Sequence, residues 1–247
     1  MSSLNTDKID TGKSAMIPKL NAYNYLNIVG YFINLIVTFG AGTLNLLPGT
    51  TSIGEMSDKY QTIVTPAGSA FSIWGIIFIA QGIFAVGQML PKYRGGPAVQ
   101  NGLKYWYFFV CIDQALWTLL FGYEQINLSL VSIASIWIFL VIANISQYNC
   151  KLERTQIEFW MLRFPFMIHC GWLAAATALN FNVVVVNSNA VASVQLTSGI
   201  ISLAVLHAIA MIYLWFIKYP NYVIPCVLIW ANVSLLKKNS YPIILSL

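Results

Sequence analysis

The chain has 247 residues, of which 58% are hydrophobic and only 9% are charged, and its formal net charge is +5. A soluble domain carries roughly a quarter charged residues, so this composition excludes an ordinary soluble domain and indicates an integral membrane protein. In such a protein the surplus of positive charge bears on orientation in the bilayer, and nucleic acid is not an expected partner.

Before the first apolar stretch, residues 1–24 form a polar N-terminal tail. Its first twenty residues lack an apolar core followed by a small-residue cleavage site, so no secretory signal peptide is expected. The four cysteines are dispersed and form no C-x-x-C pair, so neither a metal site nor a disulfide framework is expected. They are Cys111, Cys150, Cys170 and Cys226.

Seven apolar stretches follow, most of them near the roughly 20 residues that a membrane-spanning helix needs. They are Tyr25–Leu47, Pro66–Leu90, Tyr105–Tyr123, Ile126–Tyr148, Phe164–Val186, Val191–Ile217 and Tyr222–Leu236. The last is short for a span, so it either crosses fully or stops within the bilayer. The fold class expected is therefore all-α, a polytopic helical bundle in the membrane.

Lysine and arginine orient this bundle. With the N-terminus inside, ten of them fall on inner segments and three on outer segments. The outer three are Lys59, Lys237 and Lys238. Cytoplasmic loops carry the excess of positive charge in most membrane proteins, so we expect the N-terminus on the cytoplasmic-type side. The sequence does not name the membrane.

The most informative stretch is Arg163–Asn180, which contains the small-residue run Ala174–Ala178. Small residues on a membrane helix mark a face where another backbone or a flat ligand can approach closely. Trp172 and His169 precede this run by roughly one and two helical turns. The stretch is therefore either one wall of a pocket or a helix-packing face with an interfacial tryptophan.

Two earlier spans carry aromatic residues at helical spacing. In the second span, Phe71 and Trp74 lie at i and i+3 on one face. In the third span, Asp113, Trp117 and Phe121 follow one another at intervals of four residues, and Gly122 comes next. Each stripe, taken alone, is more typical of ordinary bundle packing than of a ligand site.

Together these motifs resemble the tryptophan-rich sensory protein family, also called the TspO/MBR or translocator protein (peripheral benzodiazepine receptor) family. The fifth span matches the pattern Trp-x-x-x-Ala-Thr-x-Leu-Asn through Trp172, Ala176, Thr177, Leu179 and Asn180. The second span approximates the family pattern through Pro66, Phe71 and Trp74, and the third through Asp113, Trp117, Phe121 and Gly122.

The chain also departs from the family pattern. Ser69 stands where a second-helix tryptophan is usual, Asp113 replaces an asparagine, and Pro165 lies unusually far before Trp172. The resemblance covers residues 25–186, which we therefore expect to form a five-helix core. Residues 187–247 would add two further membrane helices and a short tail, as in a divergent branch of the family.

The resemblance implies a five-helix bundle around a pocket for a flat apolar molecule, with tetrapyrroles and sterols or other lipids as the usual candidates. The side chains suit such a pocket, which is mostly apolar with a few placed polar groups. The residues expected to bind the ligand are Phe71, Trp74, Trp117, His169, Trp172, Ala176 and Asn180.

No nucleophile–base pair, metal-ligand spacing or phosphate-binding glycine loop is visible, so an enzyme is not expected. Three function classes stay open. In the first, the protein binds, or binds and transports, a hydrophobic ligand. In the second, it is an accessory subunit of a larger membrane assembly. In the third, it is a proton-coupled transporter. The expected partners are accordingly the lipid bilayer, a hydrophobic small molecule, and either other membrane subunits or a second copy.

Two ionisable residues are expected at similar depth. Asp113 follows Lys104 by nine residues, which is about 13 Å of helix. His207 precedes Ile217 by ten residues, about 15 Å. Such groups usually face the bundle interior with a partner, so one hypothesis pairs Asp113 with His207. The alternative is that each bonds separately, Asp113 to a hydroxyl or carbonyl and His207 to a backbone carbonyl.

Overall fold

The computed structural model describes residues 17–150, 155–217 and 221–245. All regular secondary structure in these ranges is helical, which confirms the all-α membrane bundle. The N-terminal tail lies mostly outside the described residues. The first helix begins at Ala22, three residues before the predicted start, because Asn21 caps it. The Asn21 side chain accepts from the backbone N–H of Tyr23 and Asn24, and the Asn24 side chain accepts from the N–H of Asn21.

Helices cover each of the seven apolar stretches. The long ones are α1 (Ala22–Val37), α3 (Ile73–Gly87), α4 (Trp106–Gly122), α5 (Ile126–Asn149), α7 (Phe164–Asn187), α8 (Ala192–Met211) and α9 (Val223–Leu245). Tighter or wider turns extend several of them, including Thr38–Thr43 after α1, Gly68–Ser72 before α3, Phe159–Arg163 before α7 and Ile212–Phe216 after α8. Two short helices, α2 (Ile53–Lys59) and α6 (Gln156–Glu158), lie in the connections.

Five helical segments of the described chain are long and apolar enough to cross a membrane, and α4 is a shorter apolar helix. The last helix, α9, has 23 residues and continues past the apolar stretch that predicted it. At 1.5 Å per residue it is about 35 Å long, enough for a core of about 30 Å. The chain is therefore a multi-pass integral membrane protein.

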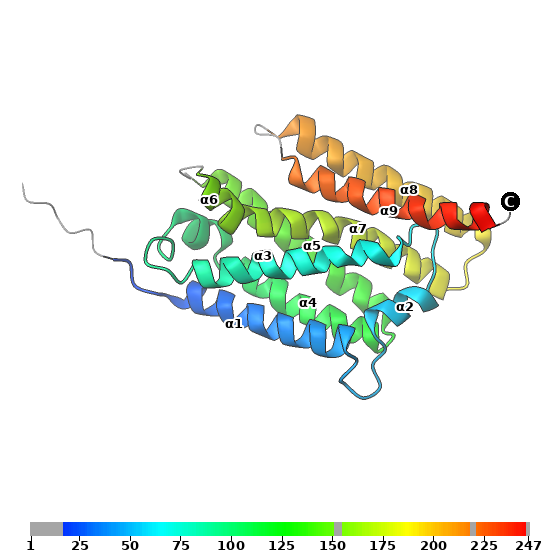
Figure 1. Ribbon diagram of the computed structural model, residues 1–247, viewed down its shortest axis with the longest axis horizontal. Helices are drawn as coiled ribbons and strands as arrows, with labels where there is room; N and C mark the ends of the chain where they lie inside the picture. The colour runs from blue at the N-terminus through cyan, green and yellow to red at the C-terminus, as the bar shows by residue number, and fades with distance from the viewer. Residues whose placement is uncertain (1–16, 151–154, 218–220, 246–247) are drawn as a thin grey trace, which may run out of the picture.

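The first five long helices close into a ring. Each packs against two neighbours, in the order α1, α3, α7, α5, α4 and back to α1. Helix α7 is the most deeply enclosed of these, because α8 and α9 cover its outer side (Figure 1). The start of α3 is also tied to α9, since the indole N–H of Trp230 donates to the carbonyl of Ala70 at 3.2 Å. The two C-terminal helices are thus an added layer on one side of the ring.

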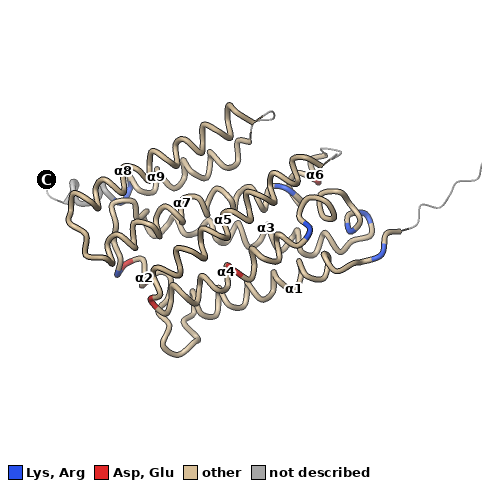
Figure 2. Tube along the Cα trace, turned by 180° about the vertical axis from the view of Figure 1, so that it is seen from behind, with Lys and Arg blue, Asp and Glu red and all other residues tan. Residues whose placement is uncertain are grey.

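Charge separates the two ends of the bundle (Figure 2). At the end where α1 begins lie five of the described basic residues: Lys19, Lys92, Arg94, Lys104 and Arg163. The opposite end carries α2 with Glu55, Asp58 and Lys59, and also Lys238 of α9, which bonds Gln61 just after α2. This separation is the pattern on which the expected orientation depends.

Cysteine labelling tests that orientation. In a variant without the native cysteines, we expect Lys92→Cys to react with an impermeant maleimide only from the side of the N-terminus. Gly54→Cys in α2 should react only from the opposite side, because both positions are exposed at opposite ends. If Lys92→Cys instead reacted from the outer face of intact cells, the predicted orientation would be wrong.

Candidate ligand-binding site

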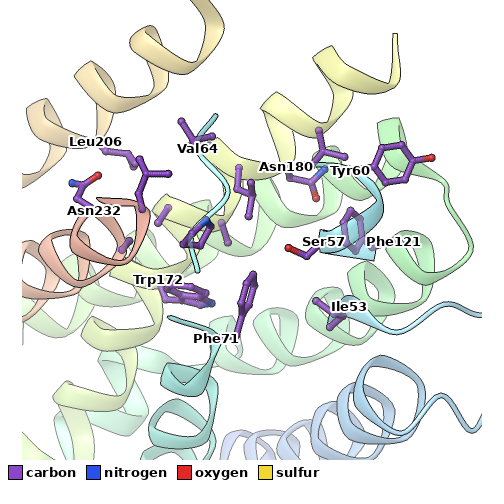
Figure 3. A pocket seen from close by; sticks show the side chains of 18 of the residues that line it. Ile53, Ser57, Tyr60, Val64, Phe71, Phe121, Trp172, Asn180, Leu206 and Asn232 are labelled. Atoms are coloured by element: carbon purple, nitrogen blue, oxygen red, sulfur yellow. The ribbon is translucent and has the colours of Figure 1, made fainter. Parts of the chain in front are cut away.

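A pocket lies where α7 meets the start of α3, helix α4 and the α2 connection (Figure 3). Trp172, Ala176 and Asn180 recur every four residues along α7, so they share the face that lines it. Phe71 and Trp74 come from the start of α3, and Trp117 comes from α4. Six of the seven residues expected to bind a ligand therefore meet around one pocket.

Aromatic rings fill most of this site. Phe71 and Trp172 meet edge to face with ring centroids 5.7 Å apart, and Trp74 meets Trp172 in the same way at 6.3 Å. Across the site, Trp117 and Phe121 stack nearly parallel at 5.3 Å. Edge-to-face and offset arrangements are the ones that aromatic quadrupoles favour. The rings thus form a stable apolar wall with flat surfaces on more than one side.

The amide of Asn180 is engaged by the protein itself. Its Oδ1 accepts from Trp117 Nε1 at 2.9 Å, and its Nδ2 donates to Ser129 Oγ at 3.1 Å. All three residues are almost fully buried. Asn180 therefore fixes the ring of Trp117 and joins α7 to α4 and α5, while lining the pocket.

This network predicts a measurable loss of stability. Asn180→Leu should lower the free energy of unfolding by about 1–3 kcal/mol, because the indole N–H of Trp117 would stay buried without a partner. The loss should be smaller in a Trp117→Phe background, which no longer has the indole donor. Thermal melting of the two single variants and the double variant measures this coupling. Strictly additive losses would contradict it.

His169 does not line the pocket, in contrast to the prediction. Its imidazole is fully buried, with Nδ1 bonded to Gln81 Nε2 at 2.8 Å. The ring also meets Trp74 edge to face at 5.6 Å. The spacing of three residues puts His169 on nearly the same face of the helix as Trp172. Its imidazole, however, bonds Gln81 of α3 instead of facing the pocket. It supports Trp74 from behind the pocket wall.

The connection between α1 and α3 supplies a wall that the sequence did not indicate. Ile53 and Ser57 of α2, followed by Tyr60 and Val64, line the pocket from this connection. Helix α2 begins at a capping box, in which Ser52 and Glu55 bond each other's backbone N–H. The Ser-x-x-Glu spacing of this box is itself a sequence signal for a helix start.

One ion pair holds α2 against the turn between α4 and α5. Lys59 Nζ lies 2.6 Å from the carboxylate of Glu124, and the hydroxyl of Tyr60 donates to the same carboxylate at 3.1 Å. The hydrogen bond from Lys59 lowers the pKa of the Glu124 carboxyl below its usual value. Since both side chains are exposed, the pair contributes little to stability, and its role is to position α2.

Helices α8 and α9 complete the pocket on its far side. In Figure 3, Leu206 and Asn232 stand opposite Ile53, Ser57 and Phe121. Further contributions come from Leu203, Ala231 and Leu235. The two C-terminal helices, expected to lie outside the five-helix core, therefore form part of the wall around the predicted residues.

The structure does not bring Asp113 and His207 together. Asp113 Oδ1 accepts from Ser132 Oγ of α5 at 3.0 Å. His207 is exposed on α8, and its Nδ1 lies 2.7 Å from the carbonyl of Leu203. The two side chains therefore bond different neighbours, on α5 and on α8 itself. The arrangement agrees with the alternative, in which each residue bonds separately.

The pocket itself is nearly filled, with a free volume of about 60 Å³. One water molecule occupies about 30 Å³ in the liquid. A much larger cavity of about 970 Å³ adjoins it between α2, the end of α1 and the start of α3. The two spaces share Ile53, Ser57, Pro66, Phe71 and Trp74 in their walls. Phe71 and Trp74 thus separate a small aromatic pocket from a large cavity.

A family model matches most of the chain. The family model described as TSPO-like protein matches residues 24–246, which takes in α8 and α9 as well as the five-helix ring. The chain matches no curated protein and no solved structure. The family match agrees with the resemblance carried by Trp172, Ala176 and Asn180, and it extends that resemblance past residue 186. The chain belongs to the TSPO-like protein family.

Proposed function

We propose that this membrane protein binds a flat hydrophobic molecule, a tetrapyrrole or a sterol-like lipid, at the aromatic pocket beneath α2. The observation that carries the proposal is the convergence of Phe71, Trp74, Trp117 and Trp172 on one pocket floored by Ala176. Small-molecule sites are typically apolar and aromatic with a few polar groups. The family membership supports the same ligand class.

The polar group offered to the ligand is the indole N–H of Trp172. This nitrogen is buried, and it has no hydrogen-bond partner among the described residues. An unpaired buried donor costs about 1–3 kcal/mol, so an acceptor on the ligand would gain from meeting it. A tetrapyrrole carboxylate and a sterol hydroxyl can both accept this bond.

The aromatic pocket is too small for such a ligand unless the side chains that separate it from the neighbouring cavity move. Ligand pockets usually measure about 300–1,000 Å³, whereas the aromatic pocket has about 60 Å³ free. Rotation of Phe71 and Trp74 would join it to the neighbouring cavity of about 970 Å³. A flat ligand would then lie with one face on Trp172 and its body in that cavity, under α2.

Titration of the purified protein tests the proposal. Protoporphyrin IX and cholesterol should each bind saturably in mild detergent, with quenching of tryptophan fluorescence or a shift of the porphyrin absorption band. Mass spectrometry of the purified sample should find a co-purified molecule of the same class. Failure of both ligands to saturate, with no co-purified molecule, would refute the proposal.

Substitution of Trp172 tests the hydrogen bond. Trp172→Phe keeps an aromatic face but removes the N–H, so affinity should fall roughly fivefold, the equivalent of about 1 kcal/mol. The matched control is Trp215→Phe, because Trp215 is 77% exposed on the outer side of the bundle. Equal affinities of the two variants would show that the indole donor does not contact the ligand.

A further inference from the structure

Helix α1 turns a polar face to the interior of the bundle. Its buried residues are Asn24, Asn27, Gly30 and Asn34, so every buried side chain on this helix is an amide. Its apolar side chains, such as Phe32 and Ile36, are exposed on the outer side. A membrane helix that only packs against its neighbours has no need of three buried amides, because each is costly in a dry interior.

The neighbouring helices α3 and α4 also place polar residues in the interior of the bundle. Gln81 of α3, Gln88 directly after this helix, and Gln114 and Thr118 of α4 are all buried. We call these four residues, with Asn24, Asn27, Asn34 and Thr38 of the first helical segment, the polar seam. It follows the length of α1, since its members there recur at intervals of three to seven residues from Asn24 to Thr38.

Both ends of the seam reach open surfaces. At the end where α1 begins, Asn24 Nδ2 donates to Gln88 Oε1 at 2.8 Å, and Asn24 Oδ1 accepts from the N–H of the exposed Asn21 at 3.1 Å. At the other end, Thr38 Oγ1 bonds Asn34 Oδ1 at 2.9 Å and lies 3.3 Å from Thr118 Oγ1. Thr38 also lines the cavity of about 970 Å³.

Between these ends the seam is not satisfied by protein atoms. Both amide atoms of Asn27 and both of Gln114 lack a partner among the described residues, as does Nε2 of His169. All three side chains are fully buried. Five unpaired polar atoms in one bundle interior would be strongly destabilising if they stayed dry. Native proteins meet such groups with bound water.

We propose that the polar seam binds a file of internal water molecules at Asn27 and Gln114, which joins the cavity under α2 to the opposite end of the bundle. Water suits the chemistry of these groups, because both amides offer donors and acceptors and an internal water usually makes about three hydrogen bonds. Through this file, water reaches the cavity under α2 from the opposite end of the bundle, without having to enter past α2. It is independent of the ligand proposed above.

Two buried cysteines provide a probe and a reference for the test within the same protein. Cys111 of α4 lies at the seam, in contact with Asn34 and Tyr107, whereas Cys170 of α7 contacts Trp137 and Tyr213 away from it. Their exposed fractions are 0% and 1%, so bulk solvent reaches neither. Pulsed X-ray radiolysis of the protein in nanodiscs generates hydroxyl radicals from bound water, and mass spectrometry then measures oxidation at each thiol.

Cys111 should be oxidised several-fold faster than Cys170. The double variant Asn27→Leu/Gln114→Leu removes the groups that hold the water, so oxidation at Cys111 should fall to the rate of Cys170. Equal rates in the unaltered protein would overturn the proposal. Should the double variant fail to fold, this comparison of the two thiols still decides the matter.

Melting temperature gives an independent readout from the single variant Asn27→Leu. If the amide is hydrated, leucine removes its bonds to water and the melting temperature falls. If the amide is dry and unpaired, the apolar side chain relieves its desolvation and the melting temperature rises. A rise would overturn the proposal, and a fall together with faster oxidation of Cys111 would establish it.

Discussion

Ala176→Phe is expected to abolish binding of a porphyrin or sterol while leaving the bundle folded. Ala176 lines the pocket between Trp172 and Asn180, where about 60 Å³ is free. A phenyl ring at this position would occupy the space against which a flat ligand would stack. We expect affinity to fall more than tenfold, which corresponds to more than about 1.4 kcal/mol. Titration with protoporphyrin IX measures it.

The matched control is Ala208→Phe. Ala208 lies on α8 and is exposed on the outer side of the bundle, so the same substitution adds the same ring away from the pocket. This variant should bind as the unaltered protein does and melt at a similar temperature. Unchanged affinity in Ala176→Phe would place the ligand elsewhere, for example wholly within the cavity beside α1.

The pocket was partly predictable because its central residues lie on one helix face. Trp172, Ala176 and Asn180 are four residues apart, and this spacing alone places them together. Helical spacing singled out Phe71 and Trp117 as well, but only the family pattern placed them in the same pocket as Trp172. Hydrophobic length likewise predicted the long helices, with boundaries that differ by a few residues where a cap such as Asn21 intervenes.

Other features depend on contacts between distant segments and were not predictable in this way. Leu206 and Asn232 reach the pocket because α8 and α9 fold back over α7, which no local pattern indicates. His169 bonds Gln81, a residue 88 positions away, and so leaves the face that its spacing suggested. Depth along a helix gave Asp113 and His207 the same level but could not give the direction of either side chain.

The polar seam shows a related limit. Asn24, Asn27 and Asn34 stand in a stretch whose composition reads as an ordinary membrane span. Hydropathy averages over all sides of a helix, whereas the amides gather on the one side that faces α3 and α4. The spacings of three and seven residues do place the three amides on one side of the helix. That this side is buried against a polar surface depends on Gln81, Gln88 and Gln114, which lie far away in the sequence.

A second large effect is expected at Gly171, where α9 packs directly against α7. A Cβ atom added there would lie 3.0 Å from the Cβ of Val227 and 3.2 Å from the Cα of Ile224. Two of the nearest atoms belong to the α9 backbone, so no side-chain rotation can relieve the contact. Gly171→Leu should therefore push α9 away and lower the free energy of unfolding by about 1–3 kcal/mol or more.

The control is Gly75→Leu on α3, because nothing lies within 4 Å of a Cβ added at Gly75. It should melt at or above the temperature of the unaltered protein, since leucine favours a helix over glycine by up to about 1 kcal/mol. Gly171→Leu should melt lower and bind porphyrin more weakly, because Ala231 and Leu235 of α9 line the pocket. If Gly171→Leu melts lower but keeps full affinity, α9 stabilises the ring without shaping the site. If it also keeps its melting temperature, α9 does not pack closely on α7 in the membrane.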